Sequence, residues 1–304
     1  MTAFQKTIQS QISCEGFGLH TGQKSAITFK PANENSGIQF VRKDIDDKTV
    51  IPALVEYVAE TNRGTTLLKG GVKVDTVEHV LSALNGVGID NINIELDGPE
   101  PPIMDGSAKV FVDILTDAGI RELNSEQMPL IIETPIHFSL QGRDSTMEVI
   151  PSFEACFTYK IDNKEIFGSQ EMTLFTMDDY TTQIAEARTF CFLSEVEAIY
   201  NHGLAKGGSL ENTIVFSDCD FEDVDVNILG KEFGLTESQM CNSIGVVGDV
   251  SLRFENEPVR HKLLDLIGDL TLLGRPIQGH ITAINAGHEM HIEFIKKLKE
   301  DYSL

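Results

Sequence analysis

The chain has 304 residues, of which 41% are hydrophobic and 23% are charged. This length permits one large domain or two of about 150 residues each, and the apolar content excludes a disordered chain. The 24 Lys and Arg face 47 Asp and Glu, which gives a net charge of −23. Such an excess of acid argues against a nucleic-acid partner and against an anionic membrane surface.

The first twenty residues contain no apolar core of signal-peptide length, and no stretch approaches the roughly 18 apolar residues of a membrane span. Five cysteines lie far apart and never form a C-x-x-C pair, which is typical of reduced thiols. We therefore expect a cytoplasmic protein without stable membrane insertion. Any metal must be bound by His, Asp or Glu.

Strands open the first half of the chain, and helices follow. From Thr7 to Phe40 apolar and polar residues alternate between glycines, which is typical of short strands. Asp75 stands three residues before Glu78, the spacing of a helix capping box, and we predict a helix of about ten residues that ends at Gly86.

A strand over Asn91–Leu96 and a second helix over Ala108–Ala118 are predicted next. The polar segment 121–128 is typical of a linker, so the first domain should end near residue 125.

The second half repeats this order. Strands are predicted at 130–138 and 146–150, then a helix over Val259–Leu273 and a strand over Gly279–Ile284. Two similar α+β lobes, 1–125 and 126–304, explain the repeat better than one continuous sheet. The acidic segment 218–249 interrupts the second pattern, and we interpret it as a surface insertion.

A polar stripe runs along the apolar helix that begins at Val259. His261, Asp265 and Asp269 are spaced four apart, so they line one side of the helix. Buried carboxylates need a partner or a metal. The stripe is therefore either an ion-paired network with Arg260 or Lys262, or part of a metal site.

Glu78-His79 opens the corresponding helix of the first half. If the repeat places the two helices face to face, His79 comes within reach of His261 and Asp265. Two His and one Asp leave a fourth position open on zinc, as in catalytic sites. Glu78 would then be a general base toward water, and metal-assisted hydrolysis is the reaction class indicated.

Two further features fit a hydrolase. Ala286-Gly287-His288 follows the last strand and should present His288 on a loop. Lys206-Gly207-Gly208-Ser209 forms a flexible segment with a cation that could approach a phosphate, although it lacks a phosphate-loop motif.

Nine motifs, in order along nearly the whole chain, resemble those of one enzyme family. They are Gly16-Phe17-Gly18-Leu19-His20-Thr21-Gly22, Thr76-Val77-Glu78-His79, Gly88-Ile89-Asp90-Asn91, Pro102-Ile103-Met104-Asp105-Gly106-Ser107, Ala187-Arg188-Thr189-Phe190, Lys206-Gly207-Gly208-Ser209, Val259-Arg260-His261-Lys262-Leu263-Leu264-Asp265, Gly268-Asp269-Leu270 and Gly287-His288. The chain resembles the UDP-3-O-acyl-N-acetylglucosamine deacetylases, metal-dependent enzymes of lipid A synthesis in Gram-negative bacteria.

The resemblance implies a role for each site residue. Zn²⁺, one per chain, would be held by His79, His261 and Asp265, with Fe²⁺ as the alternative metal. Glu78 would be the general base. His288 would be the general acid, oriented by Asp269. Lys262 and Thr189 would stabilise or position the tetrahedral intermediate.

The resemblance also implies two lobes that meet around the metal, and substrate contacts in an insert at about 188–216 that forms an acyl-chain passage. The residues implied in substrate binding are Leu19, Phe190, Val196, Ala205, Gly208, Ser209, Thr213 and Val215. The ligand would be a UDP-linked acyl sugar. A fused or associated hydroxyacyl-carrier-protein dehydratase is an implied partner, and we favour a monomer.

Two alternatives remain open at this stage. In a binding module, the same His and Asp would form a structural metal site or a buried polar network without catalysis. In a zinc peptidase, a His-Glu-x-x-His motif would be expected, but here Glu78 precedes its histidine and the motif is absent.

Overall fold

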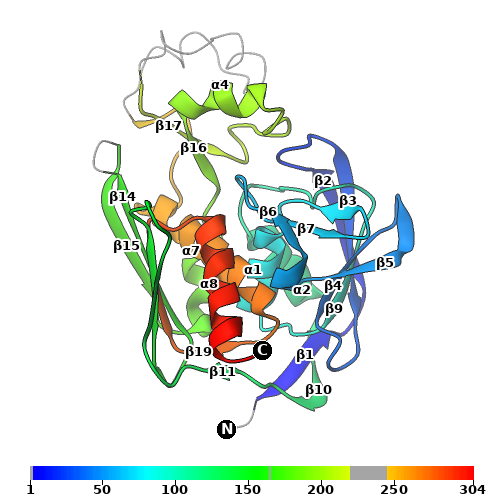
Figure 1. The fold of residues 1–304 in the computed structure, drawn as a ribbon. Helices are drawn as coiled ribbons and strands as arrows, with labels where there is room; N and C mark the ends of the chain where they lie inside the picture. The colour runs from blue at the N-terminus through cyan, green and yellow to red at the C-terminus, as the bar shows by residue number, and fades with distance from the viewer. Residues whose placement is uncertain (1–2, 164–165, 220–244) are drawn as a thin grey trace.

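The computed structural model describes residues 3–163, 166–219 and 245–304. Two β-sheets form the outer layers, and helices α1, α2, α7 and α8 lie between them (Figure 1). The mixed α+β class with two lobes, predicted from the sequence repeat, is confirmed.

The first lobe contains a five-stranded sheet with the order β2-β3-β9-β4-β5. Its strands are β2 (Ile12–Phe17), β3 (Lys24–Pro31), β4 (Ile38–Arg42), β5 (Asp46–Pro52) and β9 (Ile92–Leu96). Smaller sheets pair β6 (Val58–Glu60), β7 (Thr66–Lys69) and β8 (Val72–Val74), and β1 (Phe4–Ile8) with β10 (Ile120–Glu126). The helical elements are α1 (Glu78–Gly86), α2 (Lys109–Asp117) and the short η1 (Val55–Tyr57).

The second lobe contains a five-stranded sheet with the order β12-β13-β20-β14-β15. Its strands are β12 (Ile136–Ser139), β13 (Thr146–Ile150), β14 (Cys156–Asn163), β15 (Gly168–Leu174) and β20 (His280–Ile284). Strand β11 (Leu130–Ile131) pairs with β19 (Ile277–Gln278). The helical elements are η2 (Met177–Asp179), α3 (Tyr180–Gln183), α4 (Leu193–Asn201), α7 (Glu257–Leu270), η4 (Thr271–Leu273) and α8 (His288–Asp301).

The two large sheets have the same topology. In each sheet the last strand along the chain, β9 or β20, enters the middle, antiparallel to one neighbour and parallel to the other. A helix precedes this strand in each lobe (α1 or α7) and another follows it (α2 or α8). The helix–strand order that the sequence repeats is therefore a repeat of the fold.

Helices α1 and α7 pack backbone to backbone in the middle layer. A methyl group at Gly268 of α7 would lie 2.1 Å from the carbonyl oxygen of Glu78 on α1. Glycine at this position permits the close approach. Most of α7 is buried between the layers, as its nearly continuous apolar sequence predicts.

We expect Gly268→Ala to force the two helices apart. Overpacking of this kind typically costs about 1 to 3 kcal/mol, and metal affinity should fall because α1 and α7 each carry candidate ligands. Thermal unfolding and a metal titration measure the two effects. A methyl at Gly37 meets nothing within 4 Å, so Gly37→Ala should cost only the strain of its left-handed backbone (φ 66°) and leave metal affinity unchanged. Equal metal affinity in both variants would contradict this account.

The predicted linker at 121–128 is wrong. Residues Ile120–Glu126 form β10, which pairs antiparallel with β1 from the start of the chain. Most of the side chains on β10 are exposed or partly exposed, so its sequence lacks the apolar alternation of a half-buried strand. No sheet of the described residues mixes strands from before and after residue 126, so a boundary near 125 stays a compatible prediction.

A smaller unit projects beyond the two large sheets, around helix α4 (Figure 1). Strands β16 (Phe190–Phe192), β17 (Ile214–Ser217) and β18 (Gly245–Val246) form its sheet. It has its own cluster of buried apolar side chains, including Leu193, Val196 and Val215. Of the predicted insertion at 218–249, residues 220–244 lie outside the described residues.

None of the helices in the described residues has the length and apolar content needed to cross a bilayer.

Candidate active site

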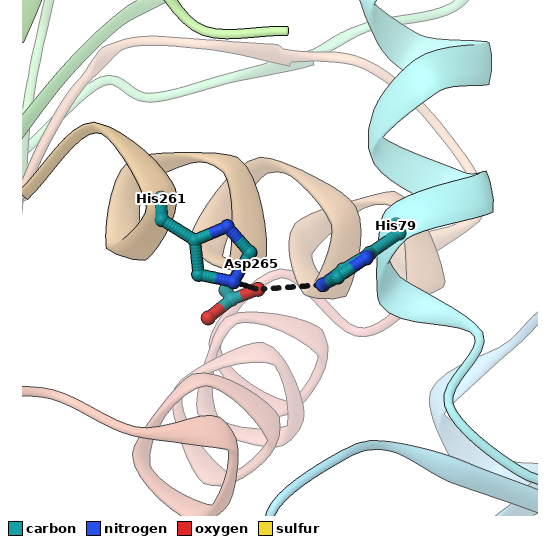
Figure 2. Close-up of side chains that lie close together, drawn as sticks. All are labelled: His79, His261 and Asp265. Atoms are coloured by element: carbon teal, nitrogen blue, oxygen red, sulfur yellow. Dashed lines mark ion pairs between the residues drawn. The ribbon is translucent and has the colours of Figure 1, made fainter. Parts of the chain in front are cut away.

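Three predicted metal ligands converge between α1 and α7 (Figure 2). His79 lies in the first turn of α1, and His261 and Asp265 lie one turn apart on α7, so both α7 side chains share one side of the helix. Their candidate ligand atoms lie within 4.8 Å of one another, and all three residues are buried. The fold therefore brings the candidate set together from the two lobes.

The separations fit a metal better than direct hydrogen bonds. Oδ1 of Asp265 lies 3.4 Å from Nε2 of His261 and 3.7 Å from Nε2 of His79, beyond the usual N–H···O range. Two ligands about 2.0 to 2.1 Å from a tetrahedral ion stand about 3.3 Å apart. Imidazole and carboxylate donors suit zinc and also iron. The residues present thus fit a divalent metal.

The charge states of the three groups also suit a metal. Burial and the neighbouring His261 lower the pKa of His79 to about 3, and burial lowers the pKa of His261, so both rings are neutral near pH 7. Although burial alone would raise it, the pKa of Asp265 lies well below its usual range because His261 and Lys262 favour the carboxylate. Metal binding needs neutral imidazoles and an ionised carboxylate.

Backbone and side-chain contacts orient these ligands. Nδ1 of His261 lies 3.0 Å from the carbonyl oxygen of Ala187, so it donates there and leaves Nε2 free to bind a metal. Lys262 donates from Nζ to Oδ2 of Asp265 at 2.7 Å. Of the two cations proposed as ion-pair partners of the stripe, Lys262 has this role. Arg260 instead donates to Asn256 and to the carbonyl oxygen of Gln183.

Glu78 is a buried carboxyl beside the ligand set. Its Oε2 accepts from the backbone N–H of Thr65 at 2.9 Å, and its Oε1 lies 3.9 Å from Nε2 of His288. The predicted capping box is wrong, since no side chain caps α1 and Asp75 accepts from Thr66 instead. Burial raises the pKa of Glu78 to about 7, so the group titrates near neutral pH, as a general base requires.

His288 is the first residue of α8 and not a loop residue as predicted. Nδ1 of His288 lies 2.7 Å from Oδ2 of Asp269, and the hydroxyl of Thr65 donates to Oδ1 of the same carboxylate at 2.6 Å. Burial disfavours charge on His288, but the carboxylate and hydrogen bond of Asp269 raise its pKa to about 9. A protonated imidazole near neutral pH can act as a general acid.

The residues implied in substrate binding lie next to this centre and in the α4 unit. Phe190 on β16 has its ring 6.3 Å from the ring of His261 and 5.9 Å from Nζ of Lys262. Thr189, just before it, is fixed by backbone hydrogen bonds with Gly106 and Ile214.

The implied acyl-passage residues lie in the α4 unit and beside it. Val196 and Val215 are buried in the α4 cluster, and Ala205 packs against it. The carbonyl oxygen of Leu19 accepts from Gly207. A methyl at Gly208 would lie 3.8 Å from the Leu19 side chain. Ser209 and Thr213 share Asn212 Oδ1 as acceptor, from the Ser209 N–H and the Thr213 hydroxyl.

Several residues at the site escaped the sequence analysis. Thr65 contacts Glu78, Asp269 and His288, but a single Thr in a loop carries no sequence signal. Phe192 and Phe216, which were also not assigned, form an aromatic cluster with Phe167 and Phe190, with ring centroids 5.3 to 6.4 Å apart. Phe190 and Phe192 are two residues apart, so on a strand they share one face, and this spacing could have predicted part of the cluster.

A cavity of about 750 Å³ opens beside His288. Its lining comes from both lobes and includes Thr61, Asn62, Arg63, Arg143 and Asn285. It offers polar and cationic groups next to the candidate acid.

Three candidate metal ligands, a buried carboxyl and an Asp-paired imidazole define the site of a hydrolytic enzyme, because hydrolysis needs an activated water and a proton donor for the leaving group. The family model described as UDP-3-O-acyl N-acetylglycosamine deacetylase matches residues 5–300, and the chain belongs to this family.

Individual relatives agree with this assignment. A UDP-3-O-acyl-N-acetylglucosamine deacetylase of Myxococcus xanthus is 39% identical over 299 residues, covering 98% of this chain and 87% of the relative. A deacetylase of the same name from Coxiella burnetii is 38% identical over 297 residues, 97% of this chain and 89% of the relative. A bifunctional enzyme LpxC/FabZ of Chlorobaculum tepidum is 44% identical over 303 residues. That alignment covers 99% of this chain but only 65% of the relative.

Proposed function

We propose that the chain hydrolyses the N-acetyl group of a UDP-3-O-acyl-N-acetylglucosamine, releasing acetate and UDP-3-O-acyl-glucosamine for lipid A synthesis. Family membership supports the substrate class. The observation that carries the proposal is the single buried centre in which His79, His261 and Asp265 lie beside Glu78 and His288.

We propose one divalent metal per chain at His79, His261 and Asp265, with zinc as the first candidate and iron as the second. When bound, the metal supplies Lewis acidity, which polarises the amide carbonyl and makes water easier to ionise. No further role is needed from it.

The side chains around the ligands divide the proton transfers. Glu78, with a pKa near neutrality, accepts a proton from the attacking water. His288 keeps its Nδ1–H on Asp269 and gives a proton from Nε2 to the departing amine. Lys262 and Thr189 are proposed to stabilise or position the oxyanion. The contact of Lys262 with Asp265 holds its ammonium within the site.

The decisive experiment measures acetate release from the acylated UDP-sugar together with the metal content of the same preparation. Stoichiometric metal and acetate release would support the proposal. A preparation that binds the UDP-sugar with metal present but releases no acetate would instead favour the binding module.

The acyl chain should contribute strongly to the reaction rate. Burying it is worth about 0.8 kcal/mol per CH₂, so a UDP-N-acetylglucosamine without the 3-O-acyl group should react far more slowly. Ser209→Leu, which narrows the proposed passage, should penalise long chains more than short ones. Glu211→Leu places the same side chain at an exposed position two residues away and is the control. Equal kcat/KM for acylated and unacylated sugars would reject the passage.

The alkaline limb of the pH–rate profile should belong to His288. Activity should fall as pH rises through the pKa of about 9, because the acid form is lost. Asp269→Asn removes the charge that holds this pKa up, so the limb should move down by about one to three pH units. Turnover should also fall by about 10 to 100-fold while the metal is retained. An unshifted limb in this variant would assign the limb to another group.

Cellular context is also a proposal. The acidic composition and the wide spacing of the cysteines support a cytoplasmic location for this reaction. Since the bifunctional relative carries a second activity in the same chain, an associated hydroxyacyl-carrier-protein dehydratase is a candidate partner. We retain the monomer as the expected state.

A further inference from the structure

One oxygen of Asp269 is shared by two histidines. Nδ1 of His288 and Nδ1 of His291 each lie 2.7 Å from Oδ2 of this carboxylate. The hydroxyl of Thr65 occupies Oδ1 at 2.6 Å. His288 and His291 lie on one side of α8, three residues apart, and His291 is fully buried.

These separations describe hydrogen bonds and not a second metal site. The three residues offer close ligand atoms, but ligands about 2.0 to 2.1 Å from a tetrahedral ion stand about 3.3 Å apart. A distance of 2.7 Å from nitrogen to oxygen is that of a charge-assisted hydrogen bond. Since an ionised carboxylate only accepts, both imidazoles must carry a proton on Nδ1.

His291 is therefore a donor whose other nitrogen is unused. With its proton on Nδ1, its Nε2 is a bare acceptor, and among the described residues this buried atom has no hydrogen-bond partner. An unpartnered buried nitrogen costs free energy. The side-chain hydrogen bond of His291 goes to Asp269, and its ring lies near the rings of Tyr159 and His288.

We propose that His291 is a positioning residue for the hydrolytic reaction. It donates a hydrogen bond to Asp269 Oδ2, the oxygen that also accepts from His288, and so weakens the hydrogen bond between His288 and this carboxylate. The carboxylate is then held on three sides, by Thr65, His288 and His291. Because His288 shares its partner, its Nε2 proton is released more readily than it would be from an undivided ion pair. The inference rests on the proposed role of His288 as general acid.

Ionisable groups on several elements surround the pair formed by His288 and His291. They are Glu78 and His79 on α1, Lys262, Asp265 and Asp269 on α7, and His291 on α8, with Tyr159 of β14 against His291 and with Glu60, Arg63, Arg143 and Glu289 lining the adjoining cavity. Among these, Asp269 is the carboxylate within hydrogen-bond distance of His288, whereas Oε1 of Glu78 lies 3.9 Å away. A change at His291 should therefore reach His288 through Asp269.

The test compares His291→Leu with His291→Asn. Leucine removes the second donor, so Oδ2 of Asp269 accepts from His288 alone. His288 should then stay protonated to a pH about half to one unit higher. The alkaline limb should move up, and kcat should fall several-fold with KM nearly unchanged. Asparagine can still donate an N–H to Asp269 and should restore the position of the limb. A limb that is unmoved or lower in His291→Leu, or equal in the two variants, would overturn the proposal.

Nuclear magnetic resonance of the metal-loaded protein with ¹⁵N-labelled histidine gives a readout that needs neither substrate nor a variant. The proposal requires a proton on Nδ1 of His291, and a proton found on its Nε2 would reject it even if the leucine variant fails to fold. In the same spectra, the pKa of His288 should be higher in His291→Leu than in the parent protein. In the Asp269→Asn background, adding His291→Leu should not change this pKa. If these shifts appear but no acetate is released, the proposed function fails and the shared carboxylate stands.

Discussion

Replacing His79 or Asp265 by alanine is expected to abolish stoichiometric metal binding and nearly all acetate release. Each variant would leave two of the three proposed ligands, and two ligands are too few to hold the ion with useful affinity. The candidate ligand atoms lie within 4.8 Å of one another in one buried set, so each of the three is placed to bind the ion directly. Metal analysis after dialysis and the acetate assay measure the two losses.

Two controls separate ligand loss from general damage. His137 is largely exposed, with 73% of its side chain accessible, and His137→Ala should keep both metal and activity. Asp269→Asn alters a buried carboxylate outside the ligand set and should keep the metal while slowing turnover. Asp265→Ala also leaves Lys262 without its partner, so the unfolding of metal-free protein should be recorded alongside. Stoichiometric metal in both His79→Ala and Asp265→Ala would reject the ligand assignment.

The second large effect is expected from Glu78→Gln. The glutamine keeps the size of the side chain and an oxygen for the Thr65 N–H but cannot accept the proton of the attacking water. The usual size of acid–base effects predicts a loss of about 10² to 10⁴-fold in kcat. Metal content should not change, because Glu78 is not among the three proposed ligands. Glu122→Gln, on the exposed face of β10, is the matched control.

A stability measurement distinguishes this loss from misfolding. Since burial raises the pKa of Glu78 to about 7, the folded state binds its proton more tightly than the unfolded chain, and the stability that this carboxyl contributes falls as pH rises toward 7. Glutamine does not ionise. Metal-free Glu78→Gln should therefore unfold at pH 8 at a temperature no lower than the parent. Near-normal acetate release with metal bound would mean that the base lies elsewhere.

Much of the candidate site could be predicted from the spacing of residues within short segments of the sequence. His261 and Asp265 share a helix face because four residues turn a helix by slightly more than one full turn, and this holds wherever the helix lies. The helices at 78–86 and 257–270 and the strand at 92–96 follow from apolar periodicity within short windows. The repeat of helix and strand order in the two halves indicated two lobes, because each half can form its own sheet and helices.

The features that the sequence analysis predicted wrongly depend on contacts between segments far apart in the chain. Glu78 fits a capping box in sequence, but in the fold its carboxyl reaches Thr65 and His288. The segment 121–128 is polar because β10 is paired on an exposed edge, so composition alone suggested a linker.

The chain itself therefore supplied the chemical groups, since residue type and helical spacing are local properties. The tertiary structure determined which of these groups contact one another. Thr65 and Asp269 are separated by 204 residues, yet they are hydrogen-bonded, and only the approach of α1 and α7 at Gly268 unites the three candidate ligands. That His288 and His291 divide one carboxylate oxygen between them is likewise a property of packed helices, because it depends on how α8 lies against α7.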